Sequence, residues 1–290
     1  MNHAQARTRR APTFVQMARR LSASEIAAAN VLCMVRHTMK LPRMSPLLVL
    51  ILCVAPQLLQ AQTIQVPDWA LPGSKTHHQV PPPAGFHRPS VVFAAPLGVF
   101  EGQADVGGPL LPGSASYDAG TRSYTLNSAS YNVWYNRDEI RYLWKKMSGD
   151  VSLAVDVAFP NAEGYADRKA LLMIRQDLDD DAKEAMTALH GAGLVHLAVR
   201  PEKNADIKAI TNLKGKRTDK VRLGLEKHGD TFALYVSVNG EPMHQVGDTA
   251  TLHLEGPFYV GVAFCSHVPD KSDTTVLSNL VFENSSGKVR

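Results

Sequence analysis

The sequence predicts an all-β fold, a sandwich or barrel of many short strands. From Val91 onward, apolar residues alternate with polar ones or gather in short runs, and glycine, asparagine and aspartate bound these runs. Asn239-Gly240 has the composition of a tight hairpin turn, because both residues tolerate the left-handed backbone conformation. Short strands at regular spacing with turns between them are typical of sandwiches and barrels.

Strands are expected at residues 91–93, 98–101, 114–118, 123–127, 131–135, 140–147, 151–159, 169–176, 194–200, 207–211, 221–227, 232–238, 249–254, 258–266 and 275–283. Alternation directs Val151, Leu153 and Val155 toward the core and the intervening side chains away from it. Residues 180–189 are expected to form one short helix, because acidic residues occupy the first turn and Gly191 follows its end.

The N-terminal part has the features of a targeting segment. Lys40 and Arg43 precede apolar residues 47–59, and Ala61 is a small residue suited to cleavage, so residues 39–61 are interpreted as a secretory signal peptide. The apolar run is shorter than the roughly twenty residues that span a bilayer. We therefore expect a periplasmic or extracellular protein with no stable membrane span after cleavage.

The remaining boundaries follow from composition. Residues 1–38 form a polar, arginine-rich extension ahead of an ordinary signal, so Met39 or Met44 is expected to be the true start. Residues 62–90 are rich in proline and lack apolar periodicity, which predicts a linker. The sandwich itself is assigned to residues 91–285.

Charge argues against nucleic-acid binding. Eight of the 31 basic residues precede Gln62 but only one of the 27 acidic residues does, so residues 62–290 carry a net charge of −3. A nucleic-acid partner is therefore not expected. Cys265 is the one cysteine after the signal peptide; it lies in a strand-like run and is expected to be a buried, inert thiol.

A series of short motifs runs in order through about residues 97 to 283: Phe100-Glu101-Gly102, Pro112-Gly113-Ser114, Leu143-Trp144-Lys145-Lys146, Ser148-Gly149-Asp150, Leu172-Met173-Ile174-Arg175-Gln176 and Phe258-Tyr259-Val260-Gly261-Val262. In this order they resemble the concanavalin A-like sandwich domains of exported bacterial proteins, which often stand in front of Tol-type biopolymer-transport β-propellers. No propeller repeat follows in this sequence. The resemblance implies a jelly-roll β-sandwich of two antiparallel sheets, with glycan binding inferred from the wider lectin and glucanase superfamily.

No enzymatic motif accompanies the fold. The Glu-x-Asp-x-x-Glu pattern of laminarinase-type glucanases, the His-Glu-x-x-His pattern of zinc hydrolases and the Gly-x-Ser-x-Gly elbow of serine hydrolases are all absent. The protein is therefore expected not to be an enzyme.

The candidate binding site combines aromatic and polar side chains. Aromatic rings stack on sugar faces, and Arg175 shares its strand face with the apolar Leu171 and Met173. The alternative is that the aromatic residues are core and the arginine is a buried group held by hydrogen bonds. The proposed ligand-binding residues are Trp134, Trp144, Arg175, Gln176, His190 and Arg200.

An acidic loop leaves one metal ion to consider. Asp177, Asp179 and Asp181 alternate as at the start of a calcium loop, but Ala182 stands where an EF-hand requires glycine. A looser surface calcium site remains as an alternative to a plain solvated loop. No other cofactor is expected.

Three functions follow, in order of preference. The first is an exported, non-catalytic module that binds a carbohydrate or another cell-envelope ligand. The second is a protein-interaction module of the cell envelope, Tol-associated by resemblance. The third is a diverged glycoside hydrolase or lyase, which would require two facing carboxylates in a cleft.

Overall fold

The computed structural model describes residues 66–67, 70–71, 74 and 81–289. The predicted signal peptide (39–61) and the extension at 1–38 lie outside these residues, so both remain predictions. Over the described ranges the secondary structure is entirely β, without an α-helix, and hence no helix there could cross a bilayer.

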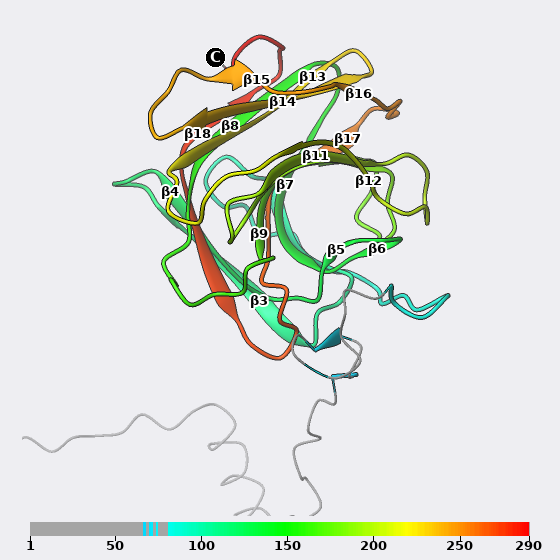
Figure 1. The fold of residues 1–290 in the computed structure, drawn as a ribbon. Helices are drawn as coiled ribbons and strands as arrows, with labels where there is room; N and C mark the ends of the chain where they lie inside the picture. Colours follow the sequence, from blue (N-terminus) through cyan, green and yellow to red (C-terminus); the bar gives the residue numbers. More distant parts are fainter. Residues whose placement is uncertain (1–65, 68–69, 72–73, 75–80, 290) are drawn as a thin grey trace, which may run out of the picture. The chain divides into compact units, whose positions relative to one another are not determined.

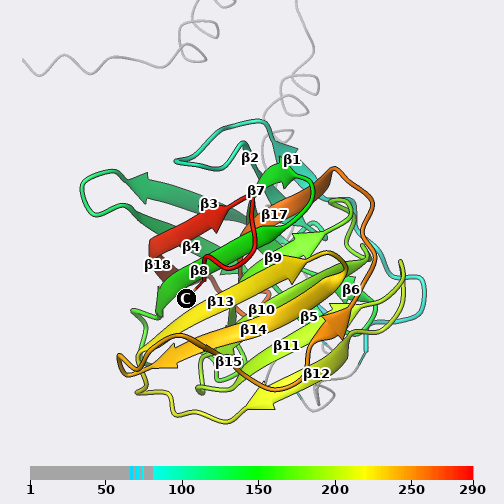
Figure 2. The ribbon, with the colours of Figure 1, turned by 90° about the horizontal axis from the view of Figure 1, so that it is seen from above.

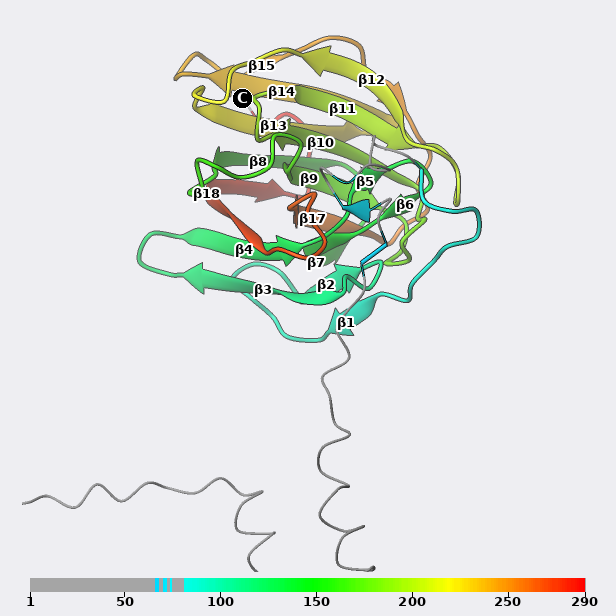
Figure 3. The same ribbon diagram turned by 60° about the horizontal axis from the view of Figure 1, so that its bottom comes forward.

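Two large antiparallel sheets face each other (Figures 1 and 2). The first runs in the spatial order β1 (Val91–Phe93), β2 (Gly102–Val106), β7 (Ile140–Met147), β17 (Phe258–Cys265), β9 (Lys169–Arg175), β10 (Glu184–His190), β11 (Val195–Arg200) and β12 (Lys208–Leu213). Figure 3 shows β1 and β12 at its opposite ends.

The second sheet runs in the order β15 (His244–Gln245), β14 (Thr231–Val238), β13 (Val221–His228), β8 (Val151–Ala158), β18 (Asp273–Glu283), β4 (Ser123–Ala129) and β3 (Leu111–Asp118), with β16 (Ala250–Thr251) paired to β14. Hairpins of consecutive strands lie toward the edges of both sheets, whereas β7, β17, β8 and β18 pair with strands distant in sequence, so the chain crosses repeatedly between the sheets. The predicted jelly-roll β-sandwich of two antiparallel sheets is confirmed in this architecture.

The main core lies between the two sheets. Val151, Leu153 and Val155 of β8 are buried in it, which confirms their predicted orientation. Leu172 and Ile174 of β9 meet them from the first sheet. Burying such apolar side chains contributes about 1.5–3 kcal/mol each relative to exposure, and this accounts for the sandwich.

The helix predicted at residues 180–189 is wrong. Residues 184–190 form β10, which is buried along its whole length between β9 and β11. Ala185 and Leu189 pack into the core, while Met186 and Ala188 join a second apolar cluster on the opposite face. Burial on both faces overrides the helix preference of this alanine-rich segment.

The outer face of the first sheet is also covered. A small hairpin of β5 (Val133–Trp134) and β6 (Arg137–Asp138) lies on the concave side of the curved first sheet (Figure 1). Val133 packs there with side chains of β7, β9, β10 and β17. The hairpin therefore closes part of this face and leaves its margins to polar groups.

Part of the segment predicted as a linker packs against the same region. Arg88 Nη1 donates to Glu139 Oε1 over 3.3 Å, and Ser90 Oγ donates to the Leu178 carbonyl over 2.6 Å. His87 Nδ1 lies 2.9 Å from Asp180 Oδ1. Residues 87–90 thus belong structurally to the sandwich.

Candidate functional site

The strand register arranges the outer face of the first sheet into two polar ends with an apolar band between them. At one end Tyr259, Arg175, Glu184 and Arg200 are cross-strand neighbours. At the other end Lys169 pairs with His190, and His196 lies one row away. The band between them consists of Leu171, Met173, Met186, Ala188 and Ala198.

The first polar end is a closed cluster of four fully buried ionisable side chains, Asp138, Arg175, Glu184 and Arg200, which we call the charge cluster. Arg200 donates two hydrogen bonds, of 2.7 and 2.9 Å, to the carboxylate of Asp138. Arg175 Nη2 lies 3.3 Å from Asp138 Oδ2, and both arginines reach Glu184 at 3.3 to 3.5 Å. Since Asp138 belongs to β6, these contacts hold the hairpin on the sheet.

The pKa values of the two carboxyl groups in the charge cluster reflect its burial. Burial favours protonation of Asp138, but the charges of Arg200 and Arg175 outweigh it and hold the pKa of that carboxyl below its usual range. Burial and the neighbouring Asp138 charge raise the pKa of Glu184. These two carboxylates are near each other, yet neither is exposed to solvent, so they do not form the open carboxylate pair that a hydrolase needs.

The second polar end is open, and we call it the histidine pocket. It is a cavity of about 330 Å³ between the β5–β6 hairpin, the starts of β9 and β11 and the edge strand β12. Its lining residues are Asn132, Trp134, Asp167, Lys169, His190, Leu194, His196, Ala209 and Asn212. A concave site with one aromatic wall and several convergent polar groups is the usual form of a small-ligand site.

A continuous chain of polar contacts runs through the histidine pocket. His190 Nδ1 lies 3.5 Å from Asp167 Oδ1, at the outer limit of a hydrogen bond, and His190 Nε2 lies 3.1 Å from His196 Nδ1. Lys169 Nζ donates to Asn132 Oδ1 over 2.8 Å. The Trp134 ring meets the His196 ring edge-on at a centroid distance of 5.6 Å.

Burial sets the protonation states of these groups. It lowers the pKa of His190 and lowers that of His196 well below its ordinary value, so both rings are neutral at pH 7. The polar contact with His190 lowers the pKa of Asp167 to about 2, which keeps this carboxylate ionised. Burial also lowers the pKa of Lys169.

The ionised Asp167 orders the two neutral imidazoles. Its oxygen lies 3.5 Å from His190 Nδ1, too far for a regular hydrogen bond, and its charge favours a proton on that nitrogen. We assign this tautomer, in which His190 Nε2 accepts from the Nδ1–H of His196. His196 Nε2 is then an acceptor, and it is buried with no hydrogen-bond partner among the described residues. A buried unsatisfied acceptor costs about 1–3 kcal/mol, which a donor such as a ligand hydroxyl would recover.

The predicted site residues separate between the two ends. Trp134 and His190 line the histidine pocket, whereas Arg175 and Arg200 lie in the charge cluster. The alternative interpretation of Arg175, a buried group held by hydrogen bonds, is the arrangement found: its Nε donates to the Asp177 carbonyl over 2.9 Å.

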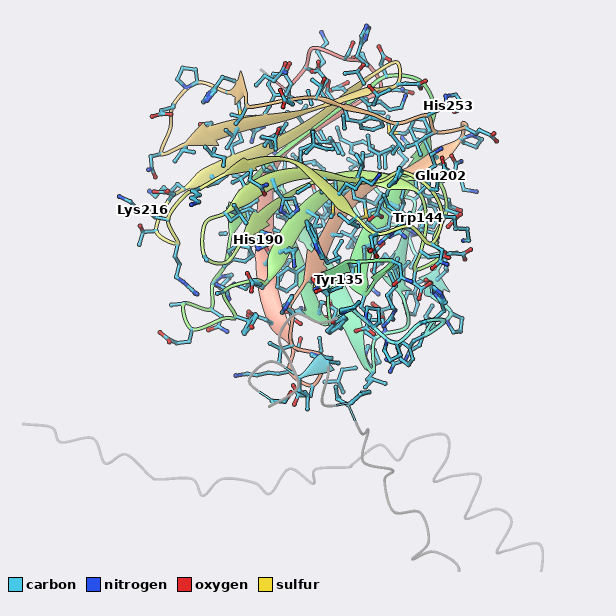
Figure 4. The ribbon with its side chains drawn as sticks, turned by 45° about the vertical axis from the view of Figure 1, so that its right-hand side comes forward. Tyr135, Trp144, His190, Glu202, Lys216 and His253 are labelled. Atoms are coloured by element: carbon cyan, nitrogen blue, oxygen red, sulfur yellow. The ribbon has the colours of Figure 1, made fainter. Side chains whose placement is uncertain are left out.

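The other two predicted residues lie elsewhere. Trp144 packs edge-on against Tyr259 at 5.0 Å, and Figure 4 shows it far across the molecule from His190. Gln176 exchanges hydrogen bonds of 2.8 Å with the backbone of Glu255. Neither lines the histidine pocket.

The acidic loop contains a basic side chain. Lys203 Nζ lies 2.6 Å from Asp179, 2.7 Å from Asp181 and 3.8 Å from Asp177. Its ammonium thus stands where a cation bound by all three carboxylates would stand. Beside it, His87, Asp180 and Asp181 bring ligand-type atoms within 4.8 Å of one another.

Several residues of the histidine pocket were missed at the sequence level. His196 could have been found, because it alternates with Ala198 and Arg200 on the outer face of β11. Lys169 alternates in the same way with Leu171 on β9. Asn132, Asp167 and Asn212 come from loops or an edge strand, and no periodic signal marks them.

Buried Cys265, at the end of β17, confirms the predicted placement of this thiol. Burial raises the pKa of the thiol, with Lys169 acting in the opposite direction. The thiolate form, which is the nucleophile, is therefore disfavoured.

Comparison with known proteins yields no family model and no curated protein that matches this chain. Solved structures that resemble it include a functionally unknown protein from Saccharomyces cerevisiae (18% identity, TM-score 0.46, 60% of this chain and 93% of the other). Others are the carbohydrate-binding module CBM66 from Bacillus subtilis (15%, 0.39, 59% and 92%) and lectin I-B4 from Griffonia simplicifolia (10%, 0.40, 59% and 90%). Values this low carry no argument about ligand or activity, so the function is argued from the site itself.

Proposed function

We propose that the protein is a non-catalytic carbohydrate-binding module and that the histidine pocket receives a sugar ring. The observation that carries this proposal is the composition of the pocket, in which one indole ring stands beside hydrogen-bonding groups: two neutral histidines, two amides, the ionised Asp167 and Lys169. Sugars present an apolar ring face and a girdle of hydroxyl groups. Trp134 suits the former, and Asn132, Asn212 and His196 suit the latter.

The neutral state of the histidines matters for this assignment. A neutral imidazole accepts a hydrogen bond from a hydroxyl, whereas an imidazolium can only donate. His196 Nε2 is an acceptor with no partner among the described residues, so a sugar hydroxyl would satisfy it. The Asp167–His190–His196 chain would hold that acceptor in place.

The test is a glycan-array screen of the full chain, followed by calorimetric titration of the best oligosaccharide. Trp134→Ala is expected to weaken binding roughly tenfold or more, equivalent to about 1.4 kcal/mol. Trp144→Ala is the matched control, since it removes a half-buried tryptophan outside the pocket and should leave the dissociation constant unchanged. Failure of the well-folded protein to bind any glycan would overturn the proposal.

The same titration separates binding from catalysis. If the bound oligosaccharide is recovered intact after prolonged incubation, the protein is a binding module. If shorter or unsaturated products accumulate and His190→Gln abolishes them, the protein is instead the diverged hydrolase or lyase. Export by the predicted signal peptide belongs to the same proposal, and recovery of the natural protein in the cytoplasm would contradict it.

A protein-interaction role is a second candidate because of the edge strand β1. Val91, Val92 and Phe93 are 37 to 50% exposed, and nearby Val99 is 49% exposed. Exposed apolar side chains on an edge strand suit a protein partner. If this role holds, Val92→Lys will abolish cross-linking of β1 to a cell-envelope protein and leave glycan binding intact.

A further inference from the structure

A second cavity adjoins the histidine pocket, and we call it the basic pocket. It has a volume of about 370 Å³ and an apolar floor that includes Val157, Phe159 and Leu189. Its rim is formed by the loop between β12 and β13. His190 lines both cavities, so the turn from β10 to β11 is the ridge between them.

Close backbone packing fixes the two cavities relative to each other. Gly193, at the ridge, has a φ of +100°, and a Cβ atom there would lie 2.4 Å from the Lys216 carbonyl carbon. Only glycine permits this approach. Residue 193 therefore holds the ridge directly against the loop that carries the basic side chains.

The charge of the basic pocket is unbalanced. Lys216, Arg217 and Lys220 are exposed on its rim, and none has a carboxylate within salt-bridge distance in the described part of the chain. Arg217 anchors its Nη1 on the carbonyls of Ala162 and Gly164, at 2.8 and 3.2 Å. The guanidinium is thereby oriented while its charge stays uncompensated.

The other two charged residues that line the basic pocket already have partners within the protein. Arg168 donates to Asp273 over 2.7 Å and lies over the Phe159 ring at 4.5 Å. Asp219 is the one carboxylate of the lining, and it accepts from the backbone N–H of Lys216 over 2.7 Å and from Asn239 over 3.2 Å. Three basic groups therefore stand against a single carboxylate that is engaged in a turn.

From this arrangement we propose that the glycan is acidic, with one sugar unit in the histidine pocket and a carboxylate or sulfate of a neighbouring unit in the basic pocket. This inference rests on the proposed carbohydrate function. Lysine ammonium groups and a guanidinium are the side chains that bind such anions, and an apolar floor accommodates the ring that carries them. The ligand must then span the ridge at His190.

The experiment compares three oligosaccharide sets of equal length: neutral, uronate-containing and sulfated. The full chain is expected to prefer an acidic set, and the preference should shrink as salt rises from low to physiological ionic strength. Preference for uronates identifies a carboxylate as the anion, and preference for the sulfated set identifies a sulfate.

Charge-reversal variants locate the contact. Lys216→Glu should weaken acidic-glycan binding by roughly fivefold or more and leave binding of neutral glycans unchanged. Lys288→Glu is the matched control, since Lys288 is exposed and lies outside both pockets. Equal effects of the two variants, or equal affinity for neutral and acidic sets, would overturn the inference while leaving the carbohydrate function standing. Absence of binding to any set would overturn both.

Discussion

The two polar ends of the first sheet are built from similar residues on the same face, yet they differ in what surrounds them. In the charge cluster, Arg175, Glu184 and Arg200 are completely buried, and Asp138 of the hairpin closes over them. In the histidine pocket, the hairpin stops short and a cavity remains. Polar residues on an outer sheet face therefore mark a site only where covering segments leave them room.

The two ends also differ in the free energy that is lost when one polar side chain is removed. Buried ion pairs are strongly coupled, so loss of one partner leaves an uncompensated charge in an apolar region. Polar groups that line a cavity cost less to remove, because water or ligand can replace their hydrogen bonds. The charge cluster is thus expected to govern stability and the histidine pocket to govern binding.

The largest expected effect comes from breaking the charge cluster. Arg200→Met removes both hydrogen bonds to Asp138 and should lower the free energy of unfolding by about 3–5 kcal/mol. Urea denaturation measures this loss. Glu184→Gln keeps the shape of the cluster and should cost less, which gives a folded variant if Arg200→Met does not fold.

Arg222→Met serves as the control for this prediction. Arg222 pairs with Asp156 at 2.8 Å on the outer face of the second sheet, where both side chains are partly exposed, so its loss should cost at most about 1 kcal/mol. Equal destabilisation by Arg200→Met and Arg222→Met would show that the cluster does not hold the hairpin.

A smaller effect is expected from pH. Burial lowers the pKa of His190 and His196 in the folded chain. Below about pH 6.5 these two histidines are therefore protonated in the unfolded chain but not in the folded chain. The two histidines should therefore lower stability below this pH, each by up to about 1.4 kcal/mol per pH unit. Glu184, whose pKa burial raises, acts in the opposite direction, because the folded chain keeps a proton there that the unfolded chain loses as the pH rises. Asp167, with a pKa of about 2, stays ionised over this range.

Thermal unfolding between pH 7.5 and 4.5 tests the pH prediction. His196→Phe should flatten the decline, because it removes the more deeply buried histidine. His253→Phe is the matched control, as this side chain is 67% exposed beside Asp230 and should leave the decline unchanged. A pH dependence of stability that is the same in the wild type and in His196→Phe would contradict the assigned protonation state of His196.

The fold was more accessible to sequence reasoning than the site. Alternation in β8 and continuous apolar runs in β9 and β17 report burial directly, and those strands were placed within a residue or two. The segment that forms β10 was predicted as a helix because alanine and glutamate have strong helix propensity. Only its pairing with β9 and β11 explains why it is extended. Glu184 was missed with it.

The prediction of the site residues failed for a different reason. Arg175 and Arg200 do lie on one sheet face, but the hairpin that buries them is held by Asp138, a residue that no periodic signal marks in the sequence. Asp167 reaches the histidine pocket from the loop that precedes the interior strand β9, and Asn212 reaches it from the edge strand β12. Such a pocket depends on how loops cover a face, and strand patterning carries no information about that.

The smallest expected effect concerns the acidic loop, which resembles the charge cluster in composition but is open to solvent. Although burial works against it, hydrogen bonds to Asp179 and Asp181 raise the pKa of Lys203, so its ammonium offsets part of the negative charge of the loop at pH 7. We therefore expect Lys203→Ala to cost at most about 1 kcal/mol in the absence of calcium. The variant should then gain stability from millimolar calcium, because three carboxylates are freed for a cation. Thermal unfolding with calcium or magnesium measures both effects, and a wild-type protein that calcium stabilises as much as the variant would show that Lys203 does not occupy the cation position.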